Sequence, residues 1–186
     1  PLLAYDASFS QDGTWVNLGN EPAYDLSLND SQLTNTSSAS FSGITKAYSF
    51  NGSNGGTLNP IQSITGDPSD NSATFELAFQ PTAGQTGNQV LFEAGGAGTG
   101  TSIVYDADNG NAIVTIDAGT FPANALQVSA PVGTADFTHL VAVYSKNFDG
   151  ANDRLELYIN GALVASDDTT SDTDGTMLAN TGQNID

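Results

Sequence analysis

The chain has 186 residues, with 21 acidic and three basic side chains, a formal net charge of −18 and no cysteine. A surface of this charge repels phosphate groups, so the composition predicts neither nucleic acid nor an anionic membrane as a partner. The same field attracts cations such as calcium, although an acidic coat also simply keeps an extracellular protein soluble. A secreted eukaryotic module of this size normally has disulfides, so the lack of cysteine indicates a secreted bacterial surface protein.

The first quarter of the chain predicts short strands separated by loops. Residues 1–9 alternate in polarity and predict a first strand, and Trp15–Leu18 predicts a second, with its tryptophan packed in a core. Residues 21–42 predict a long loop with one short strand. Ala47–Phe50 predicts a strand that ends at a cluster of glycine and asparagine.

The middle of the chain continues with strands. In Thr74–Gln80 the large apolar residues Phe75, Leu77 and Phe79 are expected to face inward, with Glu76 in solvent. An Asn109-Gly110 pair predicts a tight hairpin turn, because both residues tolerate positive φ. Four further apolar runs predict the strands Val90–Phe92, Ser102–Tyr105, Ala112–Asp117 and Ala125–Val128.

The last third contains the clearest local pattern. Phe137–Tyr144 and Leu155–Ile159 alternate as half-buried strands do, and Asn147–Arg154 predicts a loop between them. Asn160-Gly161 then predicts a hairpin into Ala162–Ala165. No stretch of useful length has a helical period, so the sequence predicts an all-β fold, a two-sheet antiparallel sandwich with almost no helix.

Several motifs resemble one known family in the right order. They are AYSFNGSN at Ala47–Asn54, ATFELAFQP at Ala73–Pro81, HLVAVY at His139–Tyr144 and LELYINGALVA at Leu155–Ala165. Together they resemble the laminin-G-like, concanavalin A-like jelly-roll domains, as found in large bacterial surface adhesins, over roughly residues 40–185. The resemblance implies a jelly-roll sandwich. It does not imply one function, because this sandwich occurs in lectins, enzymes and adhesive modules.

We expect residues 1–186 to form a single domain of this type, as a mature fragment or an excised module, since no signal peptide precedes it. Domains of the family usually close with a C-terminal strand that pairs near the N-terminal one, and the chain ends without a similar motif. The closing strand is therefore expected to be missing or supplied from elsewhere, unless residues 1–9 close the sheet alone.

Three acidic loops are candidates for calcium, which prefers six to eight oxygen ligands on a pliable loop. Asx residues are also good turn formers, so each loop has a purely structural interpretation as well. The candidate ligands are Asp168, Asp172 and Asp174 after the last strand, Asp149, Asn152 and Asp153 in the preceding loop, and Asp106 and Asp108 beside Asn109.

Catalysis is not predicted. The single histidine, His139, lies inside a strand, and the resemblance implies a structural role for it. Without cysteine or further histidine a zinc site is excluded. Retaining glucanases on this sandwich use a compact E-x-D-x-x-E strand, whereas the glutamates of this chain, Glu21, Glu76, Glu93 and Glu156, are isolated.

Sugar binding requires an aromatic face beside polar groups. Phe148, which lies next to Asp149 in a loop, and Tyr105 are the main candidates, with Tyr24 and Phe121 behind them. The sequence thus predicts a non-catalytic, calcium-assisted adhesive or carbohydrate-binding module, extracellular or on the cell surface. Its expected partners are a glycan or cell-surface ligand and neighbouring domains. The alternative is a structural, possibly split, scaffold that presents a neighbouring domain, and a polysaccharide-degrading enzyme is the least favoured interpretation.

Overall fold

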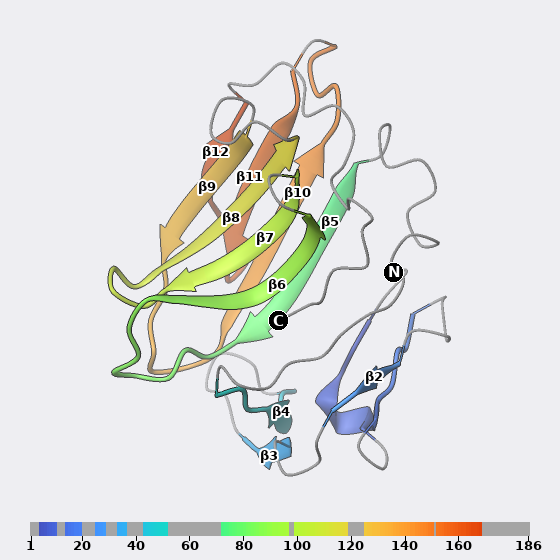
Figure 1. Cartoon of the computed structure of the whole chain (residues 1–186), viewed down its shortest axis with the longest axis vertical. Coiled ribbons are helices and arrows are strands. Elements are labelled where there is room, and N and C mark those ends of the chain that lie inside the picture. Colours follow the sequence, from blue (N-terminus) through green and yellow to red (C-terminus); the bar gives the residue numbers. More distant parts are fainter. Residues whose placement is uncertain are drawn as a thin grey trace.

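The computed structural model describes residues 4–10, 14–19, 25–28, 33–36, 43–51, 72–96, 99–118, 125–150 and 152–168. Its body is a sandwich of two four-stranded antiparallel sheets packed face to face (Figure 1). The predicted all-β, two-sheet antiparallel fold is confirmed. The strands of the sandwich are β5 (Ala73–Phe79), β6 (Asn88–Gly96), β7 (Thr99–Asp106), β8 (Asn111–Ala118), β9 (Ala125–Pro131), β10 (Thr138–Ser145), β11 (Arg154–Ile159) and β12 (Ala162–Asp167).

One sheet has the order β12-β11-β10-β5 and the other the order β6-β7-β8-β9. Successive side chains of a strand point to opposite faces, so every second residue of each strand enters the space between the sheets. In β10 the inward residues Leu140, Ala142 and Tyr144 are at most 2% exposed. On β5 the predicted inward set of Phe75, Leu77 and Phe79 packs against this core, as expected.

The two predicted hairpins are present. Asn160 and Gly161 join β11 to β12 with φ values of 52° and 82°, the positive pair that the asparagine-glycine signal requires. The Asn160 side chain also accepts a hydrogen bond from the His139 amide at 2.9 Å, which ties this turn to β10. Gly110, with φ of 70°, ends the turn between β7 and β8.

The segment before the sandwich has a small core of its own. Two short two-stranded sheets pair β1 (Thr14–Trp15) with β2 (Leu26–Ser27) and β3 (Leu33–Asn35) with β4 (Lys46–Tyr48). Trp15 packs between two tyrosine rings, with centroid distances of 5.5 Å to Tyr5 and 4.9 Å to Tyr48. The predicted packing role of Trp15 is confirmed.

Two predictions for this segment are wrong in part. Residues 1–9 were expected to form a strand, but Tyr5 makes only an isolated bridge to Asn17, and Ala7–Phe9 form a 3-10 helix, η1. The reason is local, since the Asp6 carboxylate caps the helix by accepting the Ser8 amide at 2.8 Å. Between residues 21 and 42 the described residues contain two short strands, β2 and β3, where one was expected.

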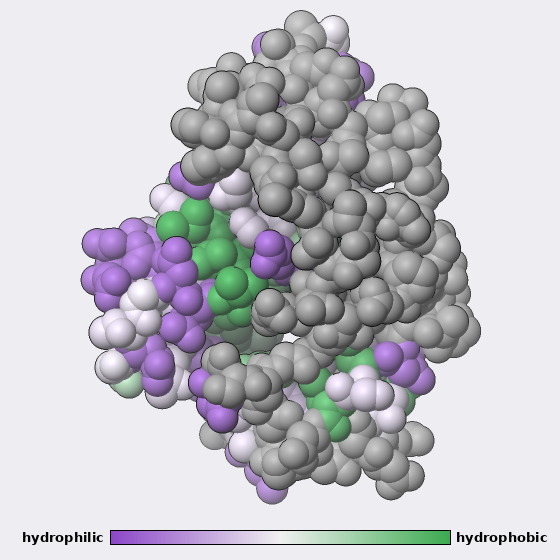
Figure 2. Space-filling model, in the orientation of Figure 1, coloured by the Kyte–Doolittle hydropathy of each residue, from purple (hydrophilic) through white to green (hydrophobic). Residues whose placement is uncertain are grey.

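The two sheets are joined along one edge of the sandwich. The Asp167 carboxylate at the end of β12 accepts a hydrogen bond from the Gln127 amide of β9 at 2.9 Å. Figure 2 shows hydrophobic residues gathered over the middle of the facing sheet, beside hydrophilic residues near the β7–β8 turn.

The structure describes nothing after residue 168, so the expected lack of a closing strand stays a prediction. Among the described residues, no helix is long and apolar enough to cross a membrane.

Candidate functional site

The base of the loop between β10 and β11 is anchored by the buried carboxylate of Asp153. Asp153 is 1% exposed. Its Oδ2 accepts the Tyr144 hydroxyl at 2.7 Å, and its Oδ1 accepts the Asn147 amide at 2.9 Å. The Lys146 ammonium lies 3.9 Å from Oδ2. These contacts hold the base of the loop, including Asn147 with its left-handed φ of 50°.

The tip of the same loop is closed by a side-chain pair. The Asp149 carboxylate accepts the Asn152 amide at 2.7 Å and the Asn152 side-chain nitrogen at 2.9 Å. Gly150 has a φ of 86°, and its amide donates to the Asn147 carbonyl at 3.1 Å. The described residues of the tip therefore hold a carboxylate and an amide against each other, directly after the aromatic residue Phe148 in the chain.

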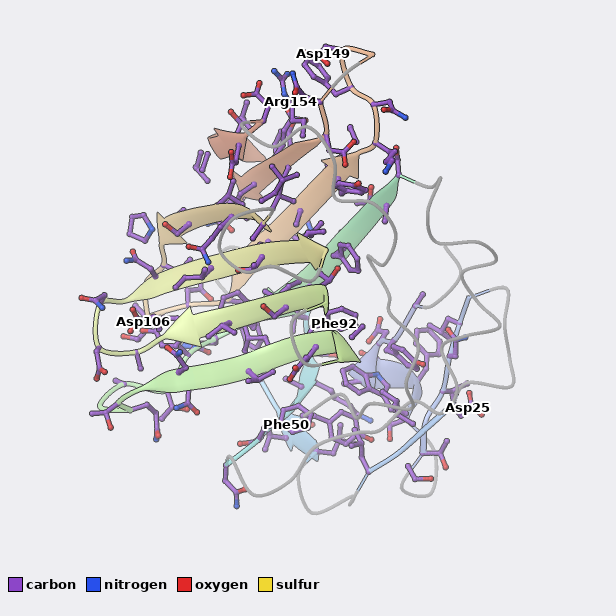
Figure 3. The ribbon with its side chains drawn as sticks, turned by 45° about the horizontal axis from the view of Figure 1, so that its top comes forward. Asp25, Phe50, Phe92, Asp106, Asp149 and Arg154 are labelled. Carbon is purple, nitrogen blue, oxygen red and sulfur yellow. The ribbon has the colours of Figure 1, made fainter. Side chains whose placement is uncertain are left out.

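That ring belongs to Phe148, which is 45% exposed. The guanidinium carbon of Arg154, at the start of β11, lies 3.3 Å from the ring centroid, and its Nη2 donates to the Asp168 carboxylate at 2.7 Å. Figure 3 shows Asp149 and Arg154 at the same end of the sandwich, well away from Asp106. Phe148 thus remains about half exposed although Arg154 covers one face of its ring.

The predicted calcium ligands of this loop are engaged by other groups of the protein. Asp149 is occupied by Asn152, and Asp153 turns into the core towards Tyr144, where a solvated cation has no access. Asp168 pairs with Arg154. Within the described ranges no group of three or more His, Cys, Asp or Glu side chains could hold a metal ion. The remaining candidate ligands, Asp172 and Asp174, lie outside the described residues.

The acidic turn between β7 and β8 is also engaged by its own residues. Asp106 accepts the Asp108 amide at 3.1 Å and the Asn109 side-chain nitrogen at 2.7 Å. The hydrogen bond from the Asn109 side chain lowers the pKa of the Asp106 carboxyl. Asp108 in turn accepts the Gly87 amide at 3.1 Å. This arrangement matches the structural interpretation of the loop, in which Asx side chains stabilise a turn.

Comparison with known proteins places the fold. The family profile described as the concanavalin A-like lectin/glucanases superfamily, of the laminin G type, matches residues 50–184. The chain belongs to this superfamily. The resemblance seen in the sequence motifs is confirmed, and the small core formed by residues 4–49 lies before the matched region.

Two solved structures share the fold of this superfamily member. The binding domain of botulinum neurotoxin DC in complex with rat synaptotagmin II is 12% identical, with a TM-score of 0.52 over 99% of this chain and 41% of that chain. Botulinum neurotoxin type C, studied for its interaction with two ganglioside molecules, is 12% identical, with a TM-score of 0.55 over 99% of this chain and 42% of that chain. The chain thus spans about two fifths of each. No curated protein sequence matches.

The sugar-binding prediction for Tyr105 is corrected. Tyr105 is 5% exposed and its ring lies 6.5 Å from that of Phe79 inside the sandwich, so it has no open face for a ligand. The alternation of β7 explains this, because Tyr105 shares the inward phase of Ile103. Tyr24 and Phe121 lie outside the described residues. Of the predicted aromatic residues, Phe148 is thus the one that the structure describes as exposed.

The superfamily includes glucanases, whose catalysis depends on a pair of carboxylates, so the positions of the acidic side chains on the outer sheet face are relevant. Glu76 on β5 and Glu156 on β11 flank β10, opposite Val141 and Val143 respectively. Two strand spacings and an offset of two residues separate their backbones by about 12 Å. Glu76 also contacts His139 Nε2 at 2.7 Å, which makes this histidine part of a cross-strand pair.

The residue that sequence reasoning missed is Arg154. Arg154 contacts Phe148, which lies six residues earlier in the chain, across the loop. Neither the helical nor the strand repeat predicts a contact between two residues placed in this way. One signal was available, since only three basic residues occur in the chain and two of them, Lys146 and Arg154, flank this loop.

Proposed function

We propose that this domain is a non-catalytic binding module that recognises an uncharged glycan with the β10–β11 loop. The observation that carries the proposal is Phe148, a ring that is 45% exposed with Arg154 over one face, and that directly precedes Asp149 of the Asp149–Asn152 pair. A ring buries the apolar face of a pyranose, while amide and carboxylate groups satisfy its hydroxyls. The order of the loop reduces the entropic cost of binding.

The proposed setting is the surface of a bacterium or its surroundings. The charge of −18 is in keeping with an extracellular protein, and the absence of cysteine favours a bacterial over a eukaryotic one. The two solved structures that share the fold, for which synaptotagmin II and gangliosides are named as partners, are in keeping with a role in cell-surface recognition. A single ring gives modest affinity, so such a module would act through several copies or with neighbouring domains. Calcium assistance belongs to this proposal and rests on the residues after Asp168.

A second candidate function is the scaffold that presents a neighbouring domain. The observation favouring it is the strand β12, where Leu163 and Val164 are 53% and 46% exposed. Within the described residues β12 pairs only with β11, so its outer edge resembles the edge that an added strand would cover. A scaffold would bind its neighbour through this edge and would not need Phe148.

The test is a glycan array followed by titration calorimetry with the tightest neutral glycan. Phe148→Ala is expected to weaken binding at least about tenfold, since it removes the stacking surface. Phe9→Ala is the matched control, because Phe9 is 54% exposed but belongs to η1 in the N-terminal segment. Unchanged affinity in Phe148→Ala would refute this site. An array without any bound glycan would refute glycan recognition and favour the scaffold.

A further inference from the structure

We propose that Arg154 is a specificity-determining residue, which occupies the cation-binding face of Phe148 and so reserves the site for uncharged ligands. The proposal rests on the glycan site described above and adds the ligand property that the site excludes. An exposed aromatic ring is by itself a good acceptor for an organic cation. In this protein the Arg154 guanidinium takes the place of such a cation.

Two separate contacts fix the position of the Arg154 guanidinium. It lies 3.3 Å above the Phe148 centroid and is tied in its own plane to Asp168 at 2.7 Å. Asp168 follows β12, whereas Arg154 begins β11, so the pair also joins two neighbouring strands. The Arg154 Nε is buried and has no hydrogen-bond partner among the described residues. The side chain therefore leaves one donor unsatisfied while it keeps its contacts with the ring and with Asp168.

The net charge of the chain explains why the contact between Arg154 and Phe148 affects ligand choice. A net charge of −18 concentrates cations near the surface, whatever the biological ligand is. Phe148 contacts Arg154, which pairs with Asp168, and Asp149 follows Phe148 in the chain, so without Arg154 an exposed ring in an acidic setting would attract ammonium groups. Such a site would be filled non-specifically.

Arg154 prevents this in two ways. It takes the covered face of the ring directly, and it neutralises Asp168. A second cation on the opposite face would be separated from the guanidinium by the ring, at a distance comparable with the screening length of about 8 Å at physiological ionic strength. The guanidinium therefore repels it only weakly, and the main effect is the loss of attraction by Asp168. A neutral pyranose is not repelled, because its contact with the ring depends on apolar burial and dispersion. The site thus favours neutral sugars over amino sugars with a free ammonium group.

The experiment compares two probes of the same shape, choline and its neutral carbon analogue 3,3-dimethylbutanol. A fluorine label on the Phe148 ring reports binding by NMR in the full chain. In the wild type the neutral probe is expected to shift the label at lower concentration than choline. In Arg154→Gln the preference is expected to move towards choline by about fivefold or more, the size of one cation–π contact.

Asp168→Asn serves as a second variant that keeps the guanidinium but removes the carboxylate that neutralises it, so it should not move the preference towards choline. Thermal unfolding of each variant checks that the fold is intact. An unchanged ratio of the two probe affinities in Arg154→Gln would overturn the inference, as would a label that neither probe shifts. Loss of glycan binding in Phe148→Ala, together with an unchanged probe ratio in Arg154→Gln, would leave the proposed function standing and refute only the role of Arg154.

Discussion

The Lys146 ammonium and the Asp153 carboxylate meet beneath the β10–β11 loop with 3.9 Å between Nζ and Oδ2, and their side chains are 10% and 1% exposed. Burial removes both charges from water, so the pair is stable only because each charge compensates the other and the carboxylate has further donors. Those donors, the Tyr144 hydroxyl and the Asn147 amide, belong to β10 and to the loop. The pair thus joins the core to the segment that carries Phe148.

Removing one member of this pair should destabilise the whole domain. Asp153→Ala leaves the Lys146 charge and the Tyr144 hydroxyl buried without this acceptor, and we expect a loss of about 3–5 kcal/mol in the free energy of unfolding. Urea denaturation measures it. Asp149→Ala is the control, since its exposed contacts with Asn152 are worth about 1 kcal/mol or less. Equal losses in the two variants would contradict the buried-pair interpretation.

The β11–β12 hairpin offers a clean test of backbone conformation. Gly161 has a φ of 82° and open space around the position of an added Cβ, so Gly161→Ala costs only conformational energy, about 1–2 kcal/mol. Gly133→Ala provides the matched control, because that glycine also has open space but no positive φ. There we expect a neutral or slightly stabilising effect, from the lower entropy of the unfolded chain. Thermal melts of both variants would show the contrast, and similar midpoints would argue against a strained turn.

Tyr5 predicts a loss of stability at high pH. Burial, with a smaller contribution from the negative charge of Asp25, raises the pKa of Tyr5 to about 12. In the unfolded chain tyrosine ionises near pH 10, so between about pH 10 and 12 the unfolded state binds fewer protons than the folded state. The free energy of unfolding therefore falls as the pH rises through this window.

Denaturation at several pH values would follow that fall, which should be shallower in Tyr5→Phe than in the wild type. Tyr158→Phe, on β11, is the control and should behave as the wild type does. Parallel pH profiles for Tyr5→Phe and the wild type would show that the fall originates elsewhere in the chain.

Calcium is the remaining prediction from the sequence. We expect the unfolding midpoint to be higher in millimolar calcium than with a chelator, since a ligand at a hundredfold its Kd stabilises the folded state by about 2.7 kcal/mol. Replacing Asp172 and Asp174 together with asparagine should abolish the shift. Asp149→Asn should retain it, because the Asp149 carboxylate is engaged by Asn152. An identical midpoint with and without calcium would show that the acidic loops bind no calcium and serve only solvation and turn formation.

The fold was largely readable from local pattern. Alternation placed β5, β8, β10 and β11, and the Asn160-Gly161 pair placed the last turn. The errors fall where local polar contacts compete with pattern, as at Asp6, whose carboxylate caps a 3-10 turn in a stretch that alternates like a strand. The Tyr105 error was avoidable, since the residue shares the phase of Ile103.

The sequence by itself determined where most strands of the sandwich run and to which superfamily the chain belongs. These properties follow from a period of two and from turn residues, which act over a few positions. Only the tertiary structure decided which side chains meet. Phe148, Arg154 and Asp168 come from a loop, a strand and the end of the next strand, and strand order and register bring them together. Register depends on packing across the whole sheet, which no local pattern contains.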